Sequence, residues 1–474
     1  MVMNNLIKLN LVILLISVHT SYAQQQSPLL NNDSSTYAIG DLDNGLKTGT
    51  WRFYNEKDVK LEEGEYVNDK KHGIWKKYYS NGSVKSKIKY EEGTAMNYVG
   101  LSSSGYIAET GDFVNNMKNG EWVTYYSNGQ KKSSTLYKNG IKDGTYKEYS
   151  PYDDVLLEGQ FKNDTTDGVW KEYNEFGRTV SEGSYIQGIK DGTWQYYYDF
   201  GMLQSLEKYD NGKPDSSWVE YHDNGAIRSY EHYNQGINIG KWETFHKNGK
   251  PEEIKYYKDG WQDSVYLTFH RNGQPAIQGF YSNGLKEGNW RYFNEDGFII
   301  EEGKYSNDRQ EGQWFTYYPK GELHTIGSFI NGLEEGLWGI FHTTGLLMQE
   351  EQWSMGKIMS AGPYYTLFGD SLSSGTLKNG TGLKINYYTD GKKEIECQFK
   401  EGIPHGSWTY YDTDGNVTEI GQFKDGVRES RWIYYFDNGQ KEAEGDYKNG
   451  NKAGIWYYYH KSGALRESVD HSEE

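Results

Sequence analysis

The chain has 474 residues, of which 57 are Gly and 44 are Tyr, whereas only 8 are Pro and 1 is Cys. Hydrophobic residues make up 35% and aromatic residues 16%, so nearly half of the apolar side chains are rings. A single cysteine excludes a disulfide scaffold and a Cys-rich zinc module. The ring content argues against disorder, and the scarcity of Val, Ile and Leu argues against a large enzyme with buried parallel strands.

The first 23 residues are predicted to form a secretory signal peptide. Lys8 precedes an apolar run at residues 9–18, and Ser21-Tyr22-Ala23 suits cleavage before Gln24. The run is short for a membrane span, and an uncleaved anchor is the alternative. We therefore expect an exported protein in the periplasm, the cell envelope or the medium.

The charge balance indicates which partners to expect. Removing the signal peptide removes Lys8 and no acid, so 49 basic residues face 67 acidic ones and the net charge is −18. An acidic surface repels phosphate backbones and anionic lipid headgroups. We therefore expect no binding to nucleic acid or to anionic membranes.

A 24-residue repeat runs through the chain. Its anchor position is held by Tyr98, Tyr146 and Tyr266, by Gly362 and Lys384 in two degenerate copies, and otherwise by Trp, which makes 18 repeats. The Trp anchors are Trp51, Trp75, Trp122, Trp170, Trp194, Trp218, Trp242, Trp290, Trp314, Trp338, Trp408, Trp432 and Trp456. A period of this length is typical of a repeat architecture.

The other positions of the repeat predict a β-hairpin. Aromatic residues recur at plus 3 and plus 15 from the anchor, and Gly, Asn or Asp at plus 7 and plus 18. Gly, Asn and Asp tolerate positive φ, so each unit should hold two tight turns and two strands, with no helix. The predicted fold is all-β: an elongated, solenoid-like single antiparallel sheet of about 18 stacked hairpins. Whether both faces carry rings, or a bulge changes the parity, stays open.

The predicted organisation follows the repeat. Residues 1–23 are the signal peptide and 24–36 a linker. Residues 37–361 are the main repeat array, with a degenerate repeat near 94–106. Residues 362–386 form a second degenerate repeat, 387–467 the C-terminal repeats and 468–474 an acidic tail.

The unit resembles the MORN-repeat variant found in bacteria. Clear copies are Gly120-Glu121-Trp122-Val123-Thr124-Tyr125-Tyr126-Ser127-Asn128-Gly129 and Glu444-Gly445-Asp446-Tyr447-Lys448-Asn449-Gly450. The resemblance covers roughly residues 37–467 and implies hairpin-repeat sheets used for binding and assembly. Some bacterial proteins with this repeat carry a YwqK-type antitoxin label, which implies neutralisation of a partner toxin. With a signal peptide, such protection would act outside the cytoplasm.

The histidines of one repeat position and the single cysteine are candidates for a chemical site. The plus-4 position holds His222, His246, His270, His342 and His460, but neighbours in such a row lie roughly 10 Å apart, too far to share one zinc. We interpret them as strand residues near a turn. Cys397 lacks spaced His and Asp partners and occupies a position that is Gly in ten other repeats, so we interpret it as a small structural residue.

The acidic segments do not indicate a metal site or an acid/base site either. Asp412-Thr413-Asp414-Gly415-Asn416 begins like a calcium loop, but Phe423 stands where a bidentate Glu is required. The pairs Glu301-Glu302 and Glu350-Glu351 are interpreted as solvated strand ends. We therefore predict no catalytic residue, no cofactor and no metal, and the sequence leaves the binding residues unspecified.

The predicted function is that of a non-enzymatic, exported scaffold that binds a protein partner along an extended aromatic surface. Binding of cell-envelope glycans and an antitoxin or immunity role are the alternatives. The degenerate segments 94–106 and 354–386 are either drift in a tolerant array or a bend, loop or docking site.

Overall fold

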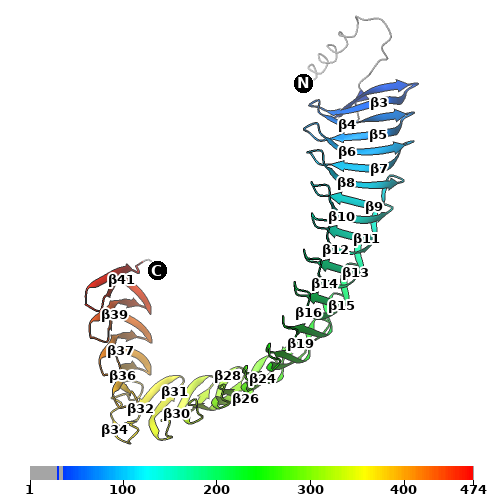
Figure 1. Cartoon of the computed structure of the whole chain (residues 1–474). Helices are drawn as coiled ribbons and strands as arrows, with labels where there is room; N and C mark the ends of the chain where they lie inside the picture. The colour runs from blue at the N-terminus through cyan, green and yellow to red at the C-terminus, as the bar shows by residue number, and fades with distance from the viewer. Residues whose placement is uncertain (1–28, 31–35, 473–474) are drawn as a thin grey trace. The chain divides into compact units, whose positions relative to one another are not determined.

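The computed structural model describes residues 29–30 and 36–472, so the predicted signal peptide and its cleavage site lie outside the described residues. None of the described residues is helical, as predicted, and accordingly this part of the chain has no helix that could cross a membrane. The chain divides into two compact units, Met1–Pro214 and Asp215–Glu474, which are described separately (Figure 1).

Unit 1 is a row of antiparallel strands in which each strand pairs with its neighbours in sequence. Its strands are β1 (Leu29–Leu30), β2 (Thr36–Asp43), β3 (Leu46–Asn55), β4 (Lys60–Val67), β5 (Lys70–Tyr78), β6 (Val84–Glu91), β7 (Thr94–Leu101), β8 (Ile107–Val114), β9 (Met117–Tyr125), β10 (Lys131–Lys138), β11 (Ile141–Tyr149), β12 (Val155–Lys162), β13 (Thr165–Tyr173), β14 (Thr179–Ile186), β15 (Ile189–Tyr197), β16 (Leu203–Asp210) and β17 (Lys213–Pro214).

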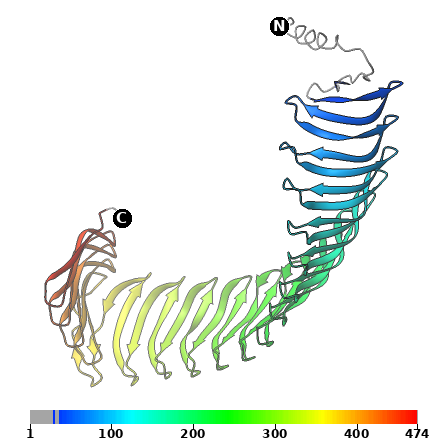
Figure 2. The same cartoon turned by 45° about the horizontal axis from the view of Figure 1, so that its top comes forward.

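Unit 2 repeats this arrangement, and its successive strands lie side by side like rungs (Figure 2). Its strands are β18 (Ser216–Tyr221), β19 (Ile227–Asn234), β20 (Ile237–Asn238), β21 (Gly240–Phe245), β22 (Pro251–Lys258), β23 (Trp261–Gln262), β24 (Ser264–Phe269), β25 (Pro275–Ser282), β26 (Leu285–Phe293), β27 (Ile299–Ser306), β28 (Arg309–Tyr317), β29 (Leu323–Ile330), β30 (Leu333–Phe341), β31 (Leu347–Ser354), β32 (Lys357–Ala361), β33 (Tyr364–Tyr365), β34 (Ser371–Leu372), β35 (Gly382–Tyr387), β36 (Lys393–Lys400), β37 (Ile403–Tyr411), β38 (Val417–Lys424), β39 (Val427–Tyr435), β40 (Lys441–Lys448), β41 (Asn451–Tyr459) and β42 (Leu465–Asp470).

The predicted all-β row of sequential hairpins is confirmed, with one difference from a single uninterrupted sheet. In unit 2 the ladder stops at β32 and resumes at β35, and the short pair β33–β34 stands between them. This interruption falls within the degenerate segment 362–386. By contrast, β7 in the degenerate segment near 94–106 keeps its pairing with β6 and β8. The last strand, β42, includes residues 468–470 of the predicted acidic tail.

Each repeat contains the two expected turns, and they differ in kind. At one end of the hairpin both turn residues have positive φ, as in Asn139 (52°) and Gly140 (88°), which is a two-residue type I′ turn. At the other end a longer turn closes with two hydrogen bonds, for example Tyr126 N to Gln130 O (2.9 Å) and Gly129 N to Tyr126 O (3.0 Å). Asn-Gly pairs therefore serve both turns.

A bulge before the anchor was not predicted. Gly168, two residues before Trp170, has a φ of 68°. The β12–β13 register passes there from Glu158↔Lys171 to Gln160↔Asp167, so β13 carries two extra residues. Gly or Ser occupies this position in nearly all repeats because the bulge requires positive φ.

Both faces of the sheet carry aromatic rings, which answers the question that the sequence left open. Trp75 packs against Phe53 and Tyr66 of the preceding repeat, with ring centroids 6.0 and 4.9 Å away. The plus-3 ring Tyr78 points to the opposite face, as its odd offset along the strand requires, and its hydroxyl hydrogen bonds to Glu63. The face with the anchor rings is called the anchor face below.

The core is the row of anchor indoles. Most are at most 7% exposed: Trp51, Trp75, Trp122, Trp170, Trp194, Trp290, Trp314, Trp432 and Trp456. Trp314 lies flat on Gly303, eleven residues earlier, where an added Cβ would come within 2.2 Å of the indole. Its Nε1–H donates to the carbonyl of Lys304 (3.1 Å). The plus-15 ring Tyr305 packs edge-on at 5.1 Å and 88°.

The degenerate repeat of unit 2 replaces this contact with a buried ion pair. Gly362 stands where the indole is expected, and Glu351 where its Gly is expected. Lys384, the next anchor, brings its Nζ 2.6 Å from Glu351 Oε1, and the two side chains are 11% and 9% exposed. Glu351 also accepts the Nε1–H of Trp353 (2.9 Å). A buried charge needs such partners, so this repeat is specifically built.

The indole–glycine contact can be tested by a double-mutant cycle. Gly303→Ala should destabilise the protein by about 1–3 kcal/mol, because the methyl group overlaps the Trp314 ring. In a Trp314→Leu background the same change should cost much less. Urea unfolding and hydrogen exchange of β27 and β28 measure both. Equal costs in the two backgrounds would refute the contact.

The buried ion pair gives a second prediction. Lys384→Met should cost about 3–5 kcal/mol, because it leaves the Glu351 charge buried without a partner. Adding Glu351→Gln should recover most of the loss, since Gln still accepts the Trp353 N–H. Lys461→Met at an exposed pair is the control and should be neutral. Urea denaturation compares the three, and a neutral Lys384→Met would contradict the prediction.

Candidate binding surface

The rings that reach solvent lie at hairpin ends, not in the anchor row. Three consecutive longer turns of unit 1 carry Tyr152, Phe176 and Phe200, which are 87, 73 and 50% exposed. Each stands six residues after its anchor, so equivalent atoms should follow one another at roughly 9–10 Å. Tyr198 stacks on Phe200, with centroids 5.3 Å apart and planes 3° apart. We call Tyr152, Phe176 and Phe200 the tip row.

The tip row departs from the ordinary composition of this turn. In five other repeats the same position holds an Asn whose amide donates to a carbonyl of the next turn at 2.6–3.1 Å: Asn128, Asn224, Asn248, Asn272 and Asn438. In unit 2 the position also holds Phe368, which is 92% exposed. Exposed acids border the rings, with Glu175 before Phe176 and Asp199 before Phe200. Three large rings therefore stand in solvent beside negative charge.

A cavity of about 350 Å³ opens on the anchor face of the same repeats, between Trp170 and Trp194. In other repeats a plus-2 ring bridges two anchors; Phe53, for example, lies 6.3 Å from Trp51 and 6.0 Å from Trp75. At Trp170 the plus-2 residue is Glu172, and the residue four before the anchor is Thr166. Both line the space, which we call the Trp170 cavity.

The opposite face carries a satisfied polar ladder. Tyr173 Oη donates to Glu158 (2.6 Å), and Lys147 pairs with the same carboxylate (2.9 Å). These hydrogen bonds lower the pKa of Glu158, while burial and the bond to Glu158 raise the pKa of Tyr173 to about 12. A general acid or base works best with a pKa near the working pH. These groups are therefore structural.

The two carboxylate pairs do not form acid/base sites. Neighbours in a strand point to opposite faces, so Glu301 and Glu302 are separated. Glu302 accepts the Tyr317 hydroxyl (2.8 Å) and pairs with Arg291 (3.0 Å), whereas burial raises the pKa of Glu301. The interpretation of both pairs as solvated strand ends is wrong, because Glu351 is buried and Glu302 lies within a strand.

The histidines of the plus-4 position join consecutive turns. The Nε2 atoms of His222, His246, His270 and His342 lie 2.7–3.3 Å from a carbonyl of the next repeat. Tyr126 makes the same contact with its hydroxyl (2.8 Å), so His and Tyr are equivalent there. His460 lies in the last such turn. Within residues 29–30 and 36–472, no group of three or more His, Cys, Asp or Glu is placed to hold a metal ion.

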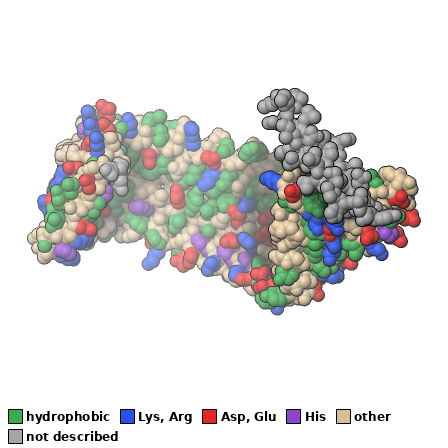
Figure 3. Space-filling view, turned by 90° about the horizontal axis from the view of Figure 1, so that it is seen from above, with side chains coloured by type: hydrophobic (Ala, Val, Ile, Leu, Met, Phe, Trp, Pro, Cys, Tyr) green, Lys and Arg blue, Asp and Glu red, His purple; other side chains and the backbone are tan. Residues whose placement is uncertain are grey.

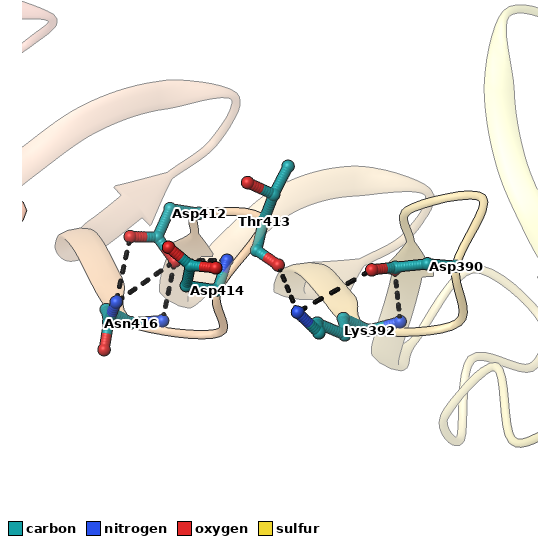
Figure 4. A network of polar contacts seen from close by, with 6 residues as sticks. All are labelled: Asp390, Lys392, Asp412, Thr413, Asp414 and Asn416. Atoms are coloured by element: carbon teal, nitrogen blue, oxygen red, sulfur yellow. Dashed lines mark hydrogen bonds and ion pairs between the residues drawn. The ribbon is translucent and has the colours of Figure 1, made fainter.

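The other candidate residues also have structural roles. Asp412 Oδ1 accepts the backbone N–H groups of Asp414 (2.9 Å) and Asn416 (2.8 Å), and Lys392 donates to the carbonyl of Thr413 (2.6 Å), as Figure 4 shows. The Asn416 amide and these backbone bonds lower the pKa of Asp412. Burial raises the pKa of Cys397 to about 11, which makes its thiol a poor nucleophile.

Unit 2 has its own exposed features. Trp261, the one Trp outside the regular ring positions, is 64% exposed and lies against the turn at Gly284. A polar cavity of about 360 Å³ is lined by His222, His246, Lys247, Asn248, Glu252 and Arg271. Its charges are partly paired, since Lys247 contacts Asp223 at 2.8 Å. On the face seen in Figure 3, acidic, basic and apolar side chains are interspersed.

One signal for the site was present in the sequence. The tip row is visible as three successive rings at a position that is Asn in six of the other fifteen repeats and a ring in only one of them, at Phe368. At Trp170 both the Lys before the anchor and the ring after it are absent, but this pattern alone does not single out the cavity, because four other anchors lack both: Trp218, Trp242, Trp314 and Trp338. Both comparisons require knowing which positions surround an anchor, which the spacing alone does not give.

Comparison with solved structures gives only distant likeness. TcdB2-TccC3-Cdc42 shares 10% identity over 95% of this chain and 29% of that chain, with a TM-score of 0.13. TcdB2-TccC3 shares 10% over 94% and 31% (TM-score 0.14), and the Photorhabdus luminescens Tc holotoxin pore 10% over 94% and 29% (0.11). The chain spans about a third of the length of those chains, and TM-scores this low carry no argument. No curated protein matches it.

Comparison with protein families identifies the repeat. Seven segments match the MORN repeat variant: residues 71–92, 118–139, 190–211, 239–259, 310–331, 404–425 and 428–449. They occur in both units and coincide with hairpins of the fold. The resemblance to the MORN variant is thus confirmed for these seven segments, and the chain is a repeat protein that carries the MORN-variant motif in them.

Proposed function

We propose that this chain is a non-enzymatic scaffold that binds a protein partner and that the tip row of unit 1 is the principal contact. The observation that carries the proposal is the exposure of Tyr152, Phe176 and Phe200 in three consecutive turns. Large rings bury much area at low entropy cost and dominate protein interfaces. Exposed on a soluble protein, they mark an interaction site.

The packing of the anchor rings favours this surface over the whole aromatic row. An anchor indole is covered by Gly on one side, and in several repeats a Lys ammonium lies over its ring, as Lys71 lies 3.8 Å from the centroid of Trp75. Such rings offer no free face for stacking on a sugar. The principal contact is therefore placed at turn residues, and a protein partner is preferred over a glycan.

The place of action follows from the predicted signal peptide. We propose that the partner is met outside the cytoplasm, in the periplasm, the cell envelope or the medium. A secreted toxin is one class of partner that this setting allows, in line with the antitoxin label of some proteins with the repeat. The seven family matches concern the repeat and support the scaffold role alone.

The proposal is tested by replacing the tip row with the residue that other turns carry. The triple variant Tyr152→Asn, Phe176→Asn, Phe200→Asn should keep its β circular dichroism but lose at least tenfold in affinity for the partner. The partner is first isolated with the wild-type protein from envelope and medium fractions and then titrated in pure form by calorimetry.

A control uses exposed apolar residues at the opposite hairpin ends of unit 1. The variant Val67→Asn, Met117→Asn, Ile189→Asn changes side chains that are 44–50% exposed and should bind the partner like the wild type. Equal affinity of the tip-row variant and the wild type would refute the proposal. Retention on a glycan array that the tip-row variant loses would replace the protein partner by a sugar.

A further inference from the structure

The array places a cation over many of its own anchor rings. In unit 1 the residue four before the anchor is Lys47, Lys71, Lys118 or Lys190, and its ammonium lies 3.7–4.7 Å from the indole centroid. In unit 2 the same place is taken by Lys286, Arg428 and Lys452, at 4.1–4.3 Å. A cation at this distance is attracted by the ring.

In two repeats of unit 1 a carboxylate completes the arrangement. Lys118 pairs with Glu109 (2.9 Å) while it lies over Trp122, and Lys71 pairs with Glu62 while it lies over Trp75. Indole, ammonium and carboxylate thus form a recurrent group on the anchor face. This group shows that an ammonium and a carboxylate fit together beside an anchor indole.

At Trp170 the ring and a carboxylate are present, but the cation is missing. The residue four before the anchor is Thr166, and among the described residues no Lys or Arg lies over the Trp170 ring. Glu172, two residues further along β13, points to the same face and lines the Trp170 cavity. It is exposed and accepts one hydrogen bond, from Ser181 (3.1 Å), with no basic partner in the described part of the chain.

Two lysines line the cavity: Lys171 pairs with Glu182 (2.8 Å), and the other, Lys190, belongs to the next repeat. The Nζ of Lys190 lies 4.3 Å from the Trp194 centroid and 2.5 Å from the Tyr196 hydroxyl. It therefore occupies the place over Trp194 that corresponds to the empty place over Trp170. The cavity of about 350 Å³ has room for one more side chain.

We propose that the Trp170 cavity takes the ammonium group of a lysine side chain from the partner protein, with Trp170 as the ring beneath it and Glu172 as its counter-ion. The inference deepens the proposed function and rests on it for the source of the lysine. Phe176 of the tip row lies four residues after Glu172 on the same hairpin, so one partner reaches both. The net charge of −17 and the acids beside the tip row also favour a basic partner.

The cavity can be probed without the partner. The probe is N-acetyl-lysine N-methylamide, and its Nε-acetylated analogue is the neutral control. The full chain, labelled with 5-fluorotryptophan, should show a saturable shift of the Trp170 fluorine resonance with the charged probe only. Trp170→Phe assigns that resonance. No shift at millimolar probe, or equal shifts with both compounds, would overturn the inference.

The most direct variant places a lysine of this chain in the cavity. Thr166→Lys restores the residue found at this position in other repeats, so it should fold normally and abolish the probe's effect. Glu172→Gln should weaken the probe at least fivefold. Gln310→Lys makes the same change before Trp314 in unit 2 and should leave probe binding unchanged. Normal probe binding by Thr166→Lys would refute the assignment.

The partner distinguishes this inference from the proposed function. If the assignment is right, Thr166→Lys should reduce partner affinity as well as probe binding. Loss of the probe with full retention of the partner would refute a partner lysine in the cavity while leaving the tip row intact. If only the tip-row variant has reduced affinity for the partner, a partner lysine in the cavity is likewise refuted.

Discussion

The contact between an anchor indole and a glycine of the preceding strand is the interaction on which the rest of the fold depends. A flat sheet of hairpins has no second layer to cover large rings. The glycine solves this, because the absence of a Cβ lets the indole lie on the backbone of the neighbouring strand, as Trp314 does on Gly303. The indole N–H then reaches the carbonyl of Lys304, so the ring is buried without an orphaned donor.

This contact links ten repeats to the one before each of them, through the pairs Gly40–Trp51, Gly64–Trp75, Gly111–Trp122, Gly159–Trp170, Gly183–Trp194, Gly279–Trp290, Gly303–Trp314, Gly327–Trp338, Gly421–Trp432 and Gly445–Trp456. The indole N–H donates to a carbonyl in eight of these pairs, whereas Nε1 of Trp290 and of Trp338 is buried without a partner among the described residues. Stability is therefore a sum over neighbours, as expected for a repeat array. The positions around the indole cannot vary freely, and variation is left to turn tips and to the few side chains that fill gaps between anchors. Those are the positions at which the tip row and the Trp170 cavity occur.

Much of this fold is predictable from the sequence, because the 24-residue period fixes the strands and the Gly, Asn and Asp positions fix the turns. The position of the bulge before the anchor was not predictable, since the positive φ at positions such as Gly168 does not show in a Gly-rich pattern. The pairing of Lys384 with Glu351 was hidden as well, because it joins residues 33 apart across an interruption of the period. The tip row can be recognised in the sequence as a change of residue type, but the solvent exposure of its rings depends on the geometry of the turns.

Two repeats lack a side chain that other repeats have, and they differ in what occupies its place. Where Trp is replaced by Gly362, the space is taken by the Lys384–Glu351 pair, which is buried and internally neutralised. Where no cation among the described residues lies over Trp170, Glu172 lines the cavity and accepts one hydrogen bond, from Ser181. A carboxylate whose one hydrogen bond comes from a hydroxyl adds little to stability by itself. A cation brought by another molecule gives Glu172 the same role that Glu109 has beside Lys118.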